Sequence, residues 1–372
     1  MRKKDLFFYK LLRPLVSVFL KIAFGYKCKQ AKNLPENYIV LSNHATDFDP
    51  LLVGAAFPRQ MYFVASEHIA RWPNAYKFIK FAFEPIMRYK GASAASTVLE
   101  MIRHVKKGAN VCMFAEGVRT WDGVTCPILP STAKVIKTAK CGLVTFKLTG
   151  GYFASPMWSG ASIRKGYLHG EVANVYTKEQ LKEMSVEEIY TAITTDLYED
   201  AYERQLANPK KYKGKNLAEH LERLMFICPK CGKRDTFHSE GNTVSCTSCG
   251  LTMHYDEYGM LDGAEFKTLK AFSDWQKEQV KAHIAAGEAY TATSGILNLV
   301  ENHEETRICE GEVSMTAQML KCGNTQIPVA DITDLAMHGQ QALVFSVGKT
   351  YYELRIAPGS NALKFFLFYK GI

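Results

Sequence analysis

A histidine and a carboxylate five residues apart suggest the first chemistry in this sequence. His44 follows the apolar run 38–42, and Asp49 stands directly before Pro50. A carboxylate that accepts the proton of one imidazole nitrogen fixes the tautomer and leaves the other nitrogen free to take a proton from a hydroxyl. Pro50 suits the first turn of a helix, which predicts Asp49 at the N-cap. The pair indicates a general base, although a turn and helix cap would use the same residues, and Asp47 is a second potential partner of the histidine.

A second polar segment follows another apolar run. Residues 110–114 lead into the sequence AEGVRT at 115–120. Gly117 allows a tight turn between a strand and a loop. Arg119 offers a planar fork of N–H donors that suits a phosphate. The segment therefore predicts an anion-binding loop at the end of a strand.

Four of the ten cysteines form two CxxC pairs with fourteen residues between the pairs, and a glycine follows each pair. They are Cys228, Cys231, Cys246 and Cys249. This spacing is typical of a zinc ribbon, in which four thiolates fill a tetrahedral shell and the metal is structural. Two disulfides or a redox CxxC are the alternatives. The scattered remaining thiols and the lack of a signal-peptide pattern favour a reducing cytosol and therefore zinc.

Short β-branched or aromatic runs alternate with helical stretches between residues 38 and 176. The predicted strands are 38–42, 61–65, 110–114, 143–148 and 168–176, and the predicted helices are 50–57, 92–107 and 131–140. This alternation predicts an α/β domain with a mainly parallel sheet and flanking helices.

The rest of the chain predicts smaller parts. Ser185 begins a capping-box pattern that opens a helix to about Ala207, and the basic run 208–215 is typical of a linker. The sequence from about 290 to 367 has a strand-like pattern, and residues 361–369 could form a closing helix. This pattern predicts an all-β barrel that resembles a pleckstrin-homology-like module. The predicted domains are a helix at 1–27, the α/β domain at 28–215, the ribbon at 216–260 and the β-rich module at 261–372.

The two polar segments together resemble the glycerophosphate and lysophospholipid acyltransferases, the 1-acyl-sn-glycerol-3-phosphate acyltransferase-like family. Asn43-His44 followed by Asp49 matches the family's N-H-x-x-x-x-D block, and FAEGVRT at 114–120 matches its F-P-E-G-T-R-S block in the correct order. The family's intervening block survives as Arg88 alone. The resemblance covers about residues 11–176.

The resemblance implies transfer of a fatty acyl group from a thioester, acyl-CoA or acyl carrier protein, to the hydroxyl of a lysophospholipid such as lysophosphatidate, in phospholipid synthesis. It implies that His44 deprotonates the hydroxyl, that Asp49 orients the histidine, and that no acyl-enzyme forms. The positions that it assigns to substrate binding are Asn43, Arg88, Glu116, Gly117 and Arg119. Acyl carrier protein is thus a potential partner besides the lipid acceptor.

The N-terminal segment 6–24 is apolar apart from one polar stripe on the expected helix. The stripe consists of Lys10, Arg13, Ser17 and Lys21. A helix of this kind suits a membrane interface, where its cations reach anionic headgroups. We therefore expect peripheral or monotopic attachment to the cytoplasmic face of the membrane; a helix packed on its own domain is the alternative.

Composition narrows the remaining function classes. The 372 residues are 47% apolar, which excludes disorder, and no uncharged apolar stretch reaches the length of a transmembrane helix. Residues 1–32 contain nine basic residues and one acidic residue, so they hold most of the net charge of +9. This distribution predicts an anionic membrane surface as partner and no nucleic acid. The competing hypothesis is an acyltransferase-like scaffold with weak catalysis that binds lipid or protein through its ribbon and β module.

Overall fold

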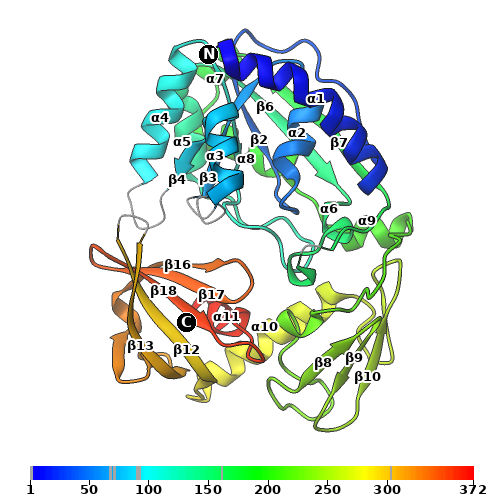
Figure 1. The fold of residues 1–372 in the computed structure, drawn as a ribbon, viewed down its shortest axis with the longest axis vertical. Helices are drawn as coiled ribbons and strands as arrows, with labels where there is room; N and C mark the ends of the chain where they lie inside the picture. The colour runs from blue at the N-terminus through cyan, green and yellow to red at the C-terminus, as the bar shows by residue number, and fades with distance from the viewer. Residues whose placement is uncertain (1–2, 67–68, 70–72, 89–93, 161, 302–303) are drawn as a thin grey trace. The chain divides into compact units, whose positions relative to one another are not determined.

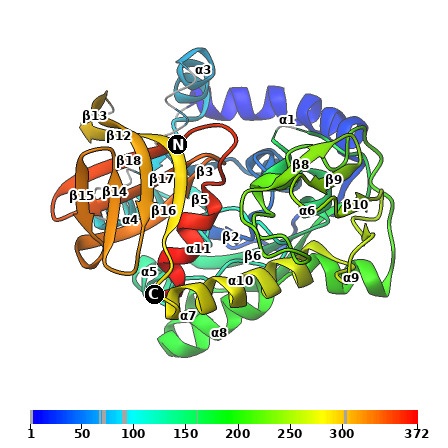
Figure 2. The ribbon, with the colours of Figure 1, turned by 90° about the horizontal axis from the view of Figure 1, so that it is seen from below.

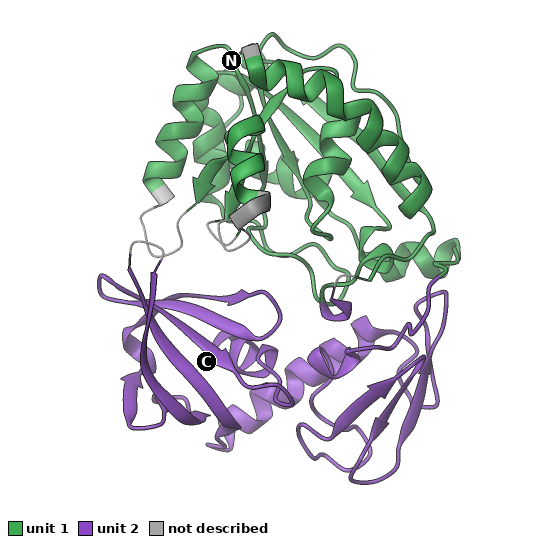
Figure 3. Cartoon of the chain, in the orientation of Figure 1, with its two compact units in different colours: residues 1–157, 161–213 green, residues 158–160, 214–372 purple. Residues whose placement is uncertain are grey.

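The structure is a computed structural model that describes residues 3–66, 69, 73–88, 94–160, 162–301 and 304–372. It divides into two compact units (Figure 3). Unit 1 holds residues 1–157 and 161–213, and unit 2 holds residues 158–160 and 214–372. The ribbon and the β-rich module, which the sequence predicts as separate domains, belong to the same unit.

Unit 1 is built on a seven-stranded sheet with the strand order β1-β7-β6-β2-β5-β3-β4. In that order the strands are Tyr26–Cys28, Leu168–Tyr176, Gly142–Thr149, Tyr38–Ser42, Asn110–Phe114, Met61–Ser66 and Ile86–Arg88. Every neighbouring pair is parallel except β6 and β7. The predicted mainly parallel sheet with flanking helices is therefore confirmed (Figure 1).

Helices cover both faces of this sheet because the central strands are apolar on both sides. In β2, Ile39 and Leu41 belong to a core that includes side chains of four helices. These are α4 (Ala94–Lys106), α5 (Ser131–Ala139), α7 (Lys178–Glu183) and α8 (Val186–Leu197). On the alternate positions of the strand, Tyr38 contacts Phe57 at the end of α2 (Asp49–Ala56), with ring centroids 6.0 Å apart. Continuous apolar strands of this kind are expected between two helical layers.

Several elements of unit 1 differ from the prediction. The sequence did not predict β1, β4, α3 (Pro73–Phe83), α6 (Gly151–Ala154) or α7. The predicted single helix after Ser185 is two helices, α8 and α9 (Ala201–Ala207), because Asp200 caps a new helix by accepting the N–H groups of Tyr202 and Glu203. The segment 208–215, predicted as a solvated linker, buries Tyr212, whose hydroxyl donates to the Tyr167 carbonyl. Residues 92–93 of one predicted helix lie outside the described residues.

The first helix, α1 (Lys3–Phe24), is anchored to α2 by its polar side chains. Tyr9 lies 2.7 Å from the carbonyl oxygens of Gly54 and Phe57, and Arg13 donates to the Ala55 carbonyl at 3.1 and 3.2 Å. These carbonyls stand at the C-terminal end of α2, where a helix leaves its acceptors unpaired and favours a cation. Arg13 is therefore turned to the protein, which corrects the expectation that the whole polar stripe faces headgroups.

The opposite side of α1 is apolar and exposed. Its exposed residues, each 50–66% accessible, follow one line along the helix: Phe7, Leu11, Leu15, Val18 and Ile22. Phe78 and Phe81 of α3 are also exposed, and both pack edge-on against Phe8. We call these seven exposed residues the apolar face. Among the described residues, no helix combines the length and apolar character needed to cross a bilayer.

Unit 2 begins with the predicted ribbon, a four-stranded antiparallel sheet with the order β11-β10-β9-β8. Its strands are Phe237–Glu240 (β8), Thr243–Cys246 (β9), Thr252–Tyr255 (β10) and Leu261–Asp262 (β11). The 17-residue helix α10 (Leu269–Ala285) follows. The sequence did not predict α10, although Thr268 caps its first turn, because the whole of 261–372 reads as a β-rich module.

The C-terminal module is one curled, all-antiparallel sheet with the order β15-β14-β13-β12-β18-β17-β16. In chain order its strands are Tyr290–Glu301 (β12), Glu304–Met315 (β13), Met319–Cys322 (β14), Thr325–Pro328 (β15), Ile332–His338 (β16), Ala342–Val347 (β17) and Thr350–Ile356 (β18). The closing helix α11 (Leu363–Gly371) packs against β16, β12 and α10 (Figures 1 and 2). The all-β module with a closing helix is confirmed, and its likeness to a pleckstrin-homology domain stays a prediction.

Three polar side chains bind the C-terminal elements of unit 2 to the ribbon. Lys364 of α11 is 1% exposed and forms an ion pair with Asp235 of the ribbon. Asn361 donates to the carbonyls of residues 222 and 223. Gln276 of α10 accepts from the N–H groups of residues 226 and 227 and donates to the carbonyl of residue 224. The ribbon therefore shares its buried contacts with the rest of unit 2.

Candidate active site

The predicted site residues of unit 1 lie at one edge of its sheet. His44 comes two residues after β2, the segment 116–119 follows β5, and Arg88 ends β4 in register with Ser66 of β3. These four strands run parallel, so their carboxyl ends share an edge. This is the edge at which open α/β sheets bind their ligands.

His44 and Asp49 form a close pair at this edge. The Nδ1 atom of His44 lies 2.8 Å from Oδ2 of Asp49. The carboxylate is fully buried, whereas the imidazole is 21% exposed and stacks on Phe114 with ring centroids 4.4 Å apart. Because the carboxylate accepts at Nδ1, that nitrogen carries the proton and Nε2 is left with its lone pair. The geometry is that of an oriented general base.

The loop before α2 holds Asp49 in place. Its Oδ2 accepts the N–H groups of Ala45 at 2.7 Å and Thr46 at 3.0 Å, and its Oδ1 accepts the Thr46 hydroxyl at 2.6 Å. Four donors, counting His44, converge on one carboxylate. The helix begins at Asp49 itself, one residue earlier than predicted, with Pro50 in its first turn. The start of a helix also favours the negative charge.

Glu116 joins the two polar segments. Its Oε1 accepts the N–H of His44 at 2.6 Å, and its Oε2 accepts the N–H of Cys126. Burial raises the pKa of Glu116 to about 8, against the opposing effect of these N–H groups. Both carboxylate oxygens of Glu116 thus accept hydrogen bonds from backbone N–H groups. The sequence predicted that Glu116 contacts substrate. Its placement favours a different role, which is to position the loop that carries His44.

Arg119 forms an ion pair with Asp47 through Nη1, and its side chain is 7% exposed. Its Nε and Nη2 atoms are buried, and no hydrogen-bond partner for them exists among the described residues. Asp47, the alternative partner that the sequence left open for His44, therefore pairs with the arginine, whereas Asp49 pairs with the histidine. Arg119 retains N–H donors for an anion.

The remaining predicted residues shape the same edge. Asn43 is buried and exchanges two 2.8 Å hydrogen bonds with the backbone of Leu148 in β6. Gly117 has φ +70°, in the left-handed region, and its N–H donates to the Phe114 carbonyl in a tight turn. Arg88 lies at the end of β4, with β3 between its strand and β5. The substrate-binding roles of these residues stay predictions.

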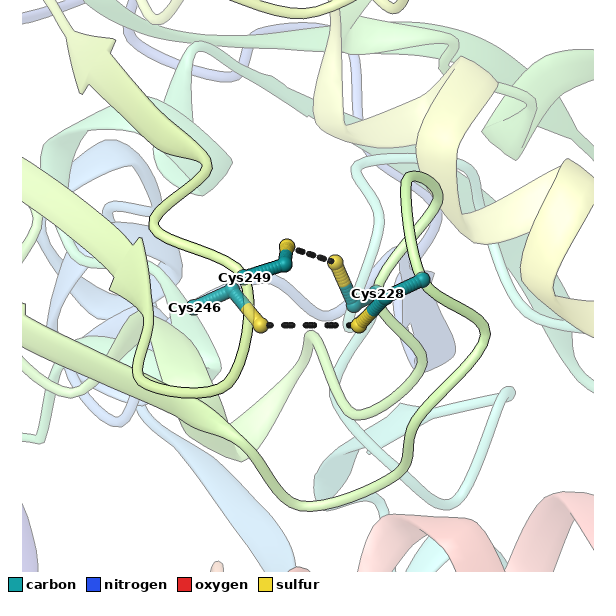
Figure 4. A group of neighbouring side chains, drawn as sticks. Cys228, Cys246 and Cys249 are labelled. Carbon is teal, nitrogen blue, oxygen red and sulfur yellow. Dashed lines mark hydrogen bonds between the residues drawn. The ribbon is translucent and has the colours of Figure 1, made fainter.

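The four cysteines of the two CxxC pairs form one cluster in unit 2 (Figure 4). Their sulfur atoms lie within 4.8 Å of one another, with Cys228 Sγ 3.6 Å from Cys249 Sγ and Cys231 Sγ 3.9 Å from Cys246 Sγ. A tetrahedron with Zn–S bonds of about 2.3 Å has edges of about 3.8 Å, whereas a disulfide requires about 2.05 Å. The cluster could therefore hold a metal ion, and these two S–S distances are close to the edge length of a tetrahedral zinc shell.

Comparison with known proteins decides the class of unit 1. Residues 25–149 match the family model described as Acyltransferase. The chain contains an acyltransferase domain. The match covers both polar segments, so the predictions of an acyltransferase fold and of an acyltransferase enzyme are confirmed.

Among solved structures, the acyltransferase domain is similar to the 1-acyl-sn-glycerophosphate (LPA) acyltransferase PlsC from Thermotoga maritima. The two chains are 19% identical, the likeness covers 54% of this chain and 81% of that chain, and the TM-score is 0.44. Comparison with curated proteins finds no match.

Two residues of the acyltransferase domain were not singled out for the roles that the structure gives them. Thr46 supports Asp49 with both its N–H and its hydroxyl, and Asp47 pairs with Arg119. Threonine three residues before a helix-start aspartate is a local pattern that could have been noticed. The pairing of Asp47 depends on how two loops meet, and spacing along the chain does not contain that information.

Proposed function

We propose that the protein is a membrane-associated O-acyltransferase. It moves a fatty acyl group from a thioester to the hydroxyl of a lysophospholipid such as lysophosphatidate, in phospholipid synthesis. The observation that carries this proposal is the oriented pair of His44 and Asp49 at the ligand-binding edge of an acyltransferase domain. The donor is acyl-CoA or acyl carrier protein.

The reaction that this pair supports is direct attack. Nε2 of His44 takes the proton of the acceptor hydroxyl as its oxygen bonds to the thioester carbonyl carbon. The bond from that carbon to sulfur then breaks, and the imidazolium returns the proton to the leaving thiolate. Asp49 stabilises the imidazolium. Cys112, in β5, is fully buried and burial raises its pKa, so this thiol is unsuited to carrying an acyl group.

The acceptor's phosphate would bind to Arg119. Its side chain is nearly buried, yet two of its nitrogen atoms have no partner among the described residues. A buried guanidinium with free donors is poorly solvated, and a phosphate oxygen would satisfy it with a charge-assisted hydrogen bond. Arg88, at the same edge, is the candidate for a second cationic contact.

Membrane attachment is proposed through the apolar face of α1 and α3, peripheral or monotopic and on the cytoplasmic side. Its seven side chains are large and exposed, and Lys10 and Lys21 on the same helix are exposed cations that suit anionic headgroups. The test is cosedimentation with phosphatidylglycerol vesicles. Replacing Leu11, Leu15 and Ile22 together by serine should weaken binding at least about tenfold.

Leu206 of α9 is 61% exposed but lies outside the apolar face, so Leu206→Ser is the matched control for that experiment. It should leave vesicle binding unchanged. Equal losses in the triple variant and the control would show that general surface hydrophobicity drives the binding, and the proposed orientation would then be wrong.

We propose that the four-cysteine cluster binds zinc, with a structural role. The four sulfur atoms supply a complete tetrahedral set, so no coordination position remains for a substrate. Zinc bound there would connect the two knuckles of the ribbon. The acyl-transfer step proposed for unit 1 requires no metal.

The deciding experiment measures thiol release from acyl-CoA and from acyl carrier protein by the purified full chain, with lysophosphatidate in detergent. His44→Ala should lower turnover by about 10²–10⁴-fold. His169→Ala, in β7 of the same unit, is the control and should keep turnover near that of the wild type. No turnover by the wild type with any donor would favour the scaffold hypothesis instead.

A further inference from the structure

The ion pair between Arg119 and Asp47 joins two side chains of very different exposure. The side chain of Arg119 is 7% exposed, and the side chain of Asp47 is 65% exposed. Asp47 belongs to the loop between β2 and α2, three residues after His44 and two before Asp49. One loop therefore carries two carboxylates: a buried one that orients the base, and an exposed one that neutralises the arginine proposed to hold substrate.

The exposure of Asp47 makes this contact exchangeable. A carboxylate that is already two-thirds in water loses little solvation when it leaves its partner. The guanidinium is in the opposite situation, because it is buried and would be left uncompensated. Arg119 therefore needs an anion beside it at all times. A different anion can take the place of the Asp47 carboxylate.

We propose that Asp47 is a resident counterion that occupies part of the acceptor's phosphate site and is displaced when the acceptor binds. This inference rests on the proposed function. A phosphate monoester carries about −1.5 to −2 charge at neutral pH and has three acceptor oxygens. The carboxylate of Asp47 carries one negative charge and has two acceptor oxygens. A monoester would therefore displace the carboxylate, and its further oxygens would offer acceptors to Nε and Nη2 of Arg119, which are buried and have no hydrogen-bond partner among the described residues.

Selectivity among acceptors follows from this competition. A neutral monoacylglycerol gains nothing at Arg119 and leaves the ion pair intact. A phosphodiester such as lysophosphatidylcholine brings a single negative charge and competes with Asp47 on nearly equal terms. Asp47 therefore acts as a specificity-determining residue that favours a dianionic headgroup, without contact with the reacting atoms.

The test compares wild type with Asp47→Asn, and uses Glu179→Gln as the control for net charge. Glu179 is an exposed residue of α7, outside the candidate site. With lysophosphatidate as acceptor, Asp47→Asn should lower KM about threefold to tenfold and leave kcat within about twofold, the size expected for loss of one competing ion pair. With monoacylglycerol its KM should not change.

Thermal unfolding with inorganic phosphate as probe gives a readout independent of turnover. Without phosphate, Asp47→Asn should melt at a lower temperature than wild type, because the buried guanidinium has lost its counterion. Phosphate should raise the melting temperature of Asp47→Asn more than that of wild type. Asp47→Glu keeps a carboxylate and should restore wild-type behaviour in both assays.

The outcomes separate this inference from the proposed function. If wild type turns over lysophosphatidate but Asp47→Asn has an unchanged or higher KM, or if Glu179→Gln reproduces its effect, the role of Asp47 is refuted and the enzyme assignment stands. If no acyl transfer occurs, the proposed function fails. The larger phosphate-induced shift of Asp47→Asn would then still support the counterion, and equal shifts would refute it.

Discussion

Replacing Asp49 by asparagine tests the chemistry at its most constrained point. The carboxylate receives four donors: His44 Nδ1, the N–H groups of residues 45 and 46, and the Thr46 hydroxyl. Asparagine keeps the shape but offers one oxygen, so its amide nitrogen must face at least one of these donors. An amide that donates to Nδ1 forces the histidine proton onto Nε2, which is the nitrogen that must accept a proton from substrate.

The expected loss can be sized from these contacts. Hydrogen bonds to a charged group contribute about 1.5–3 kcal/mol each, and they are not additive within one cluster. We expect the free energy of unfolding to fall by about 2–4 kcal/mol. Turnover of the folded variant should fall by about 10²–10⁴-fold because the wrong tautomer is present.

Asp196 provides a matched control. It is a partly buried aspartate on α8 that accepts from Thr145 at 2.7 Å, Asn174 at 2.6 Å and Tyr176 at 2.9 Å, with no contact to the histidine. Asp196→Asn should lose stability but keep turnover per folded molecule. The assay is thiol release at a temperature where circular dichroism shows both variants folded. Turnover of Asp49→Asn within about tenfold of wild type would refute the tautomer argument.

Three other predictions follow from buried groups. Because the pKa of Glu116 in the folded protein, about 8, lies above its ordinary 4.5, the folded state holds this proton more tightly. Stability should therefore decline as pH rises from about 4.5 to 8, and Glu116→Gln should flatten that decline in urea titrations; an equal slope in both proteins would contradict it. Elemental analysis should find one zinc per chain in wild type and in Cys28→Ser, and Cys246→Ser should lose it; retention of zinc would exclude the four-thiolate site. Lys364→Met should lower the free energy of unfolding of unit 2 by about 1–3 kcal/mol, whereas exposed Lys370→Met on the same helix should not.

The sequence was most informative where a local signal and a burial pattern agree. The strands β2, β5 and β7 begin and end where predicted. In β2 and β5 the signal is a short, mostly apolar and mostly buried run. The two acyltransferase segments and the CxxC pairs could be recognised because their spacing along the chain is itself the signal. The structure brings His44 and Asp49 within hydrogen-bond distance, as their spacing suggested.

The sequence was least informative where two distant segments decide the outcome. The direction of Arg13 depends on the end of α2 some forty residues away, where unpaired carbonyls draw it inward. The helix α3 is short, and several of its apolar side chains are exposed. Its sequence pattern therefore does not distinguish a helix from a strand. The pairing of Asp47 with Arg119 joins two loops that only the finished sheet brings together.

The attachment of α11 to the ribbon has a consequence for synthesis on the ribosome. The backbone carbonyl of Glu222 accepts a hydrogen bond from Asn361, which lies 139 residues later in the chain. Asp235 pairs with Lys364, which lies 129 residues later. At about 5–20 residues per second, the ribbon lacks these last contacts for roughly 6–30 seconds. During that interval bound metal would be the main restraint on its knuckles. If the ribbon binds zinc as proposed, we expect a shortage of zinc to destabilise it most during this interval, before α11 makes its contacts.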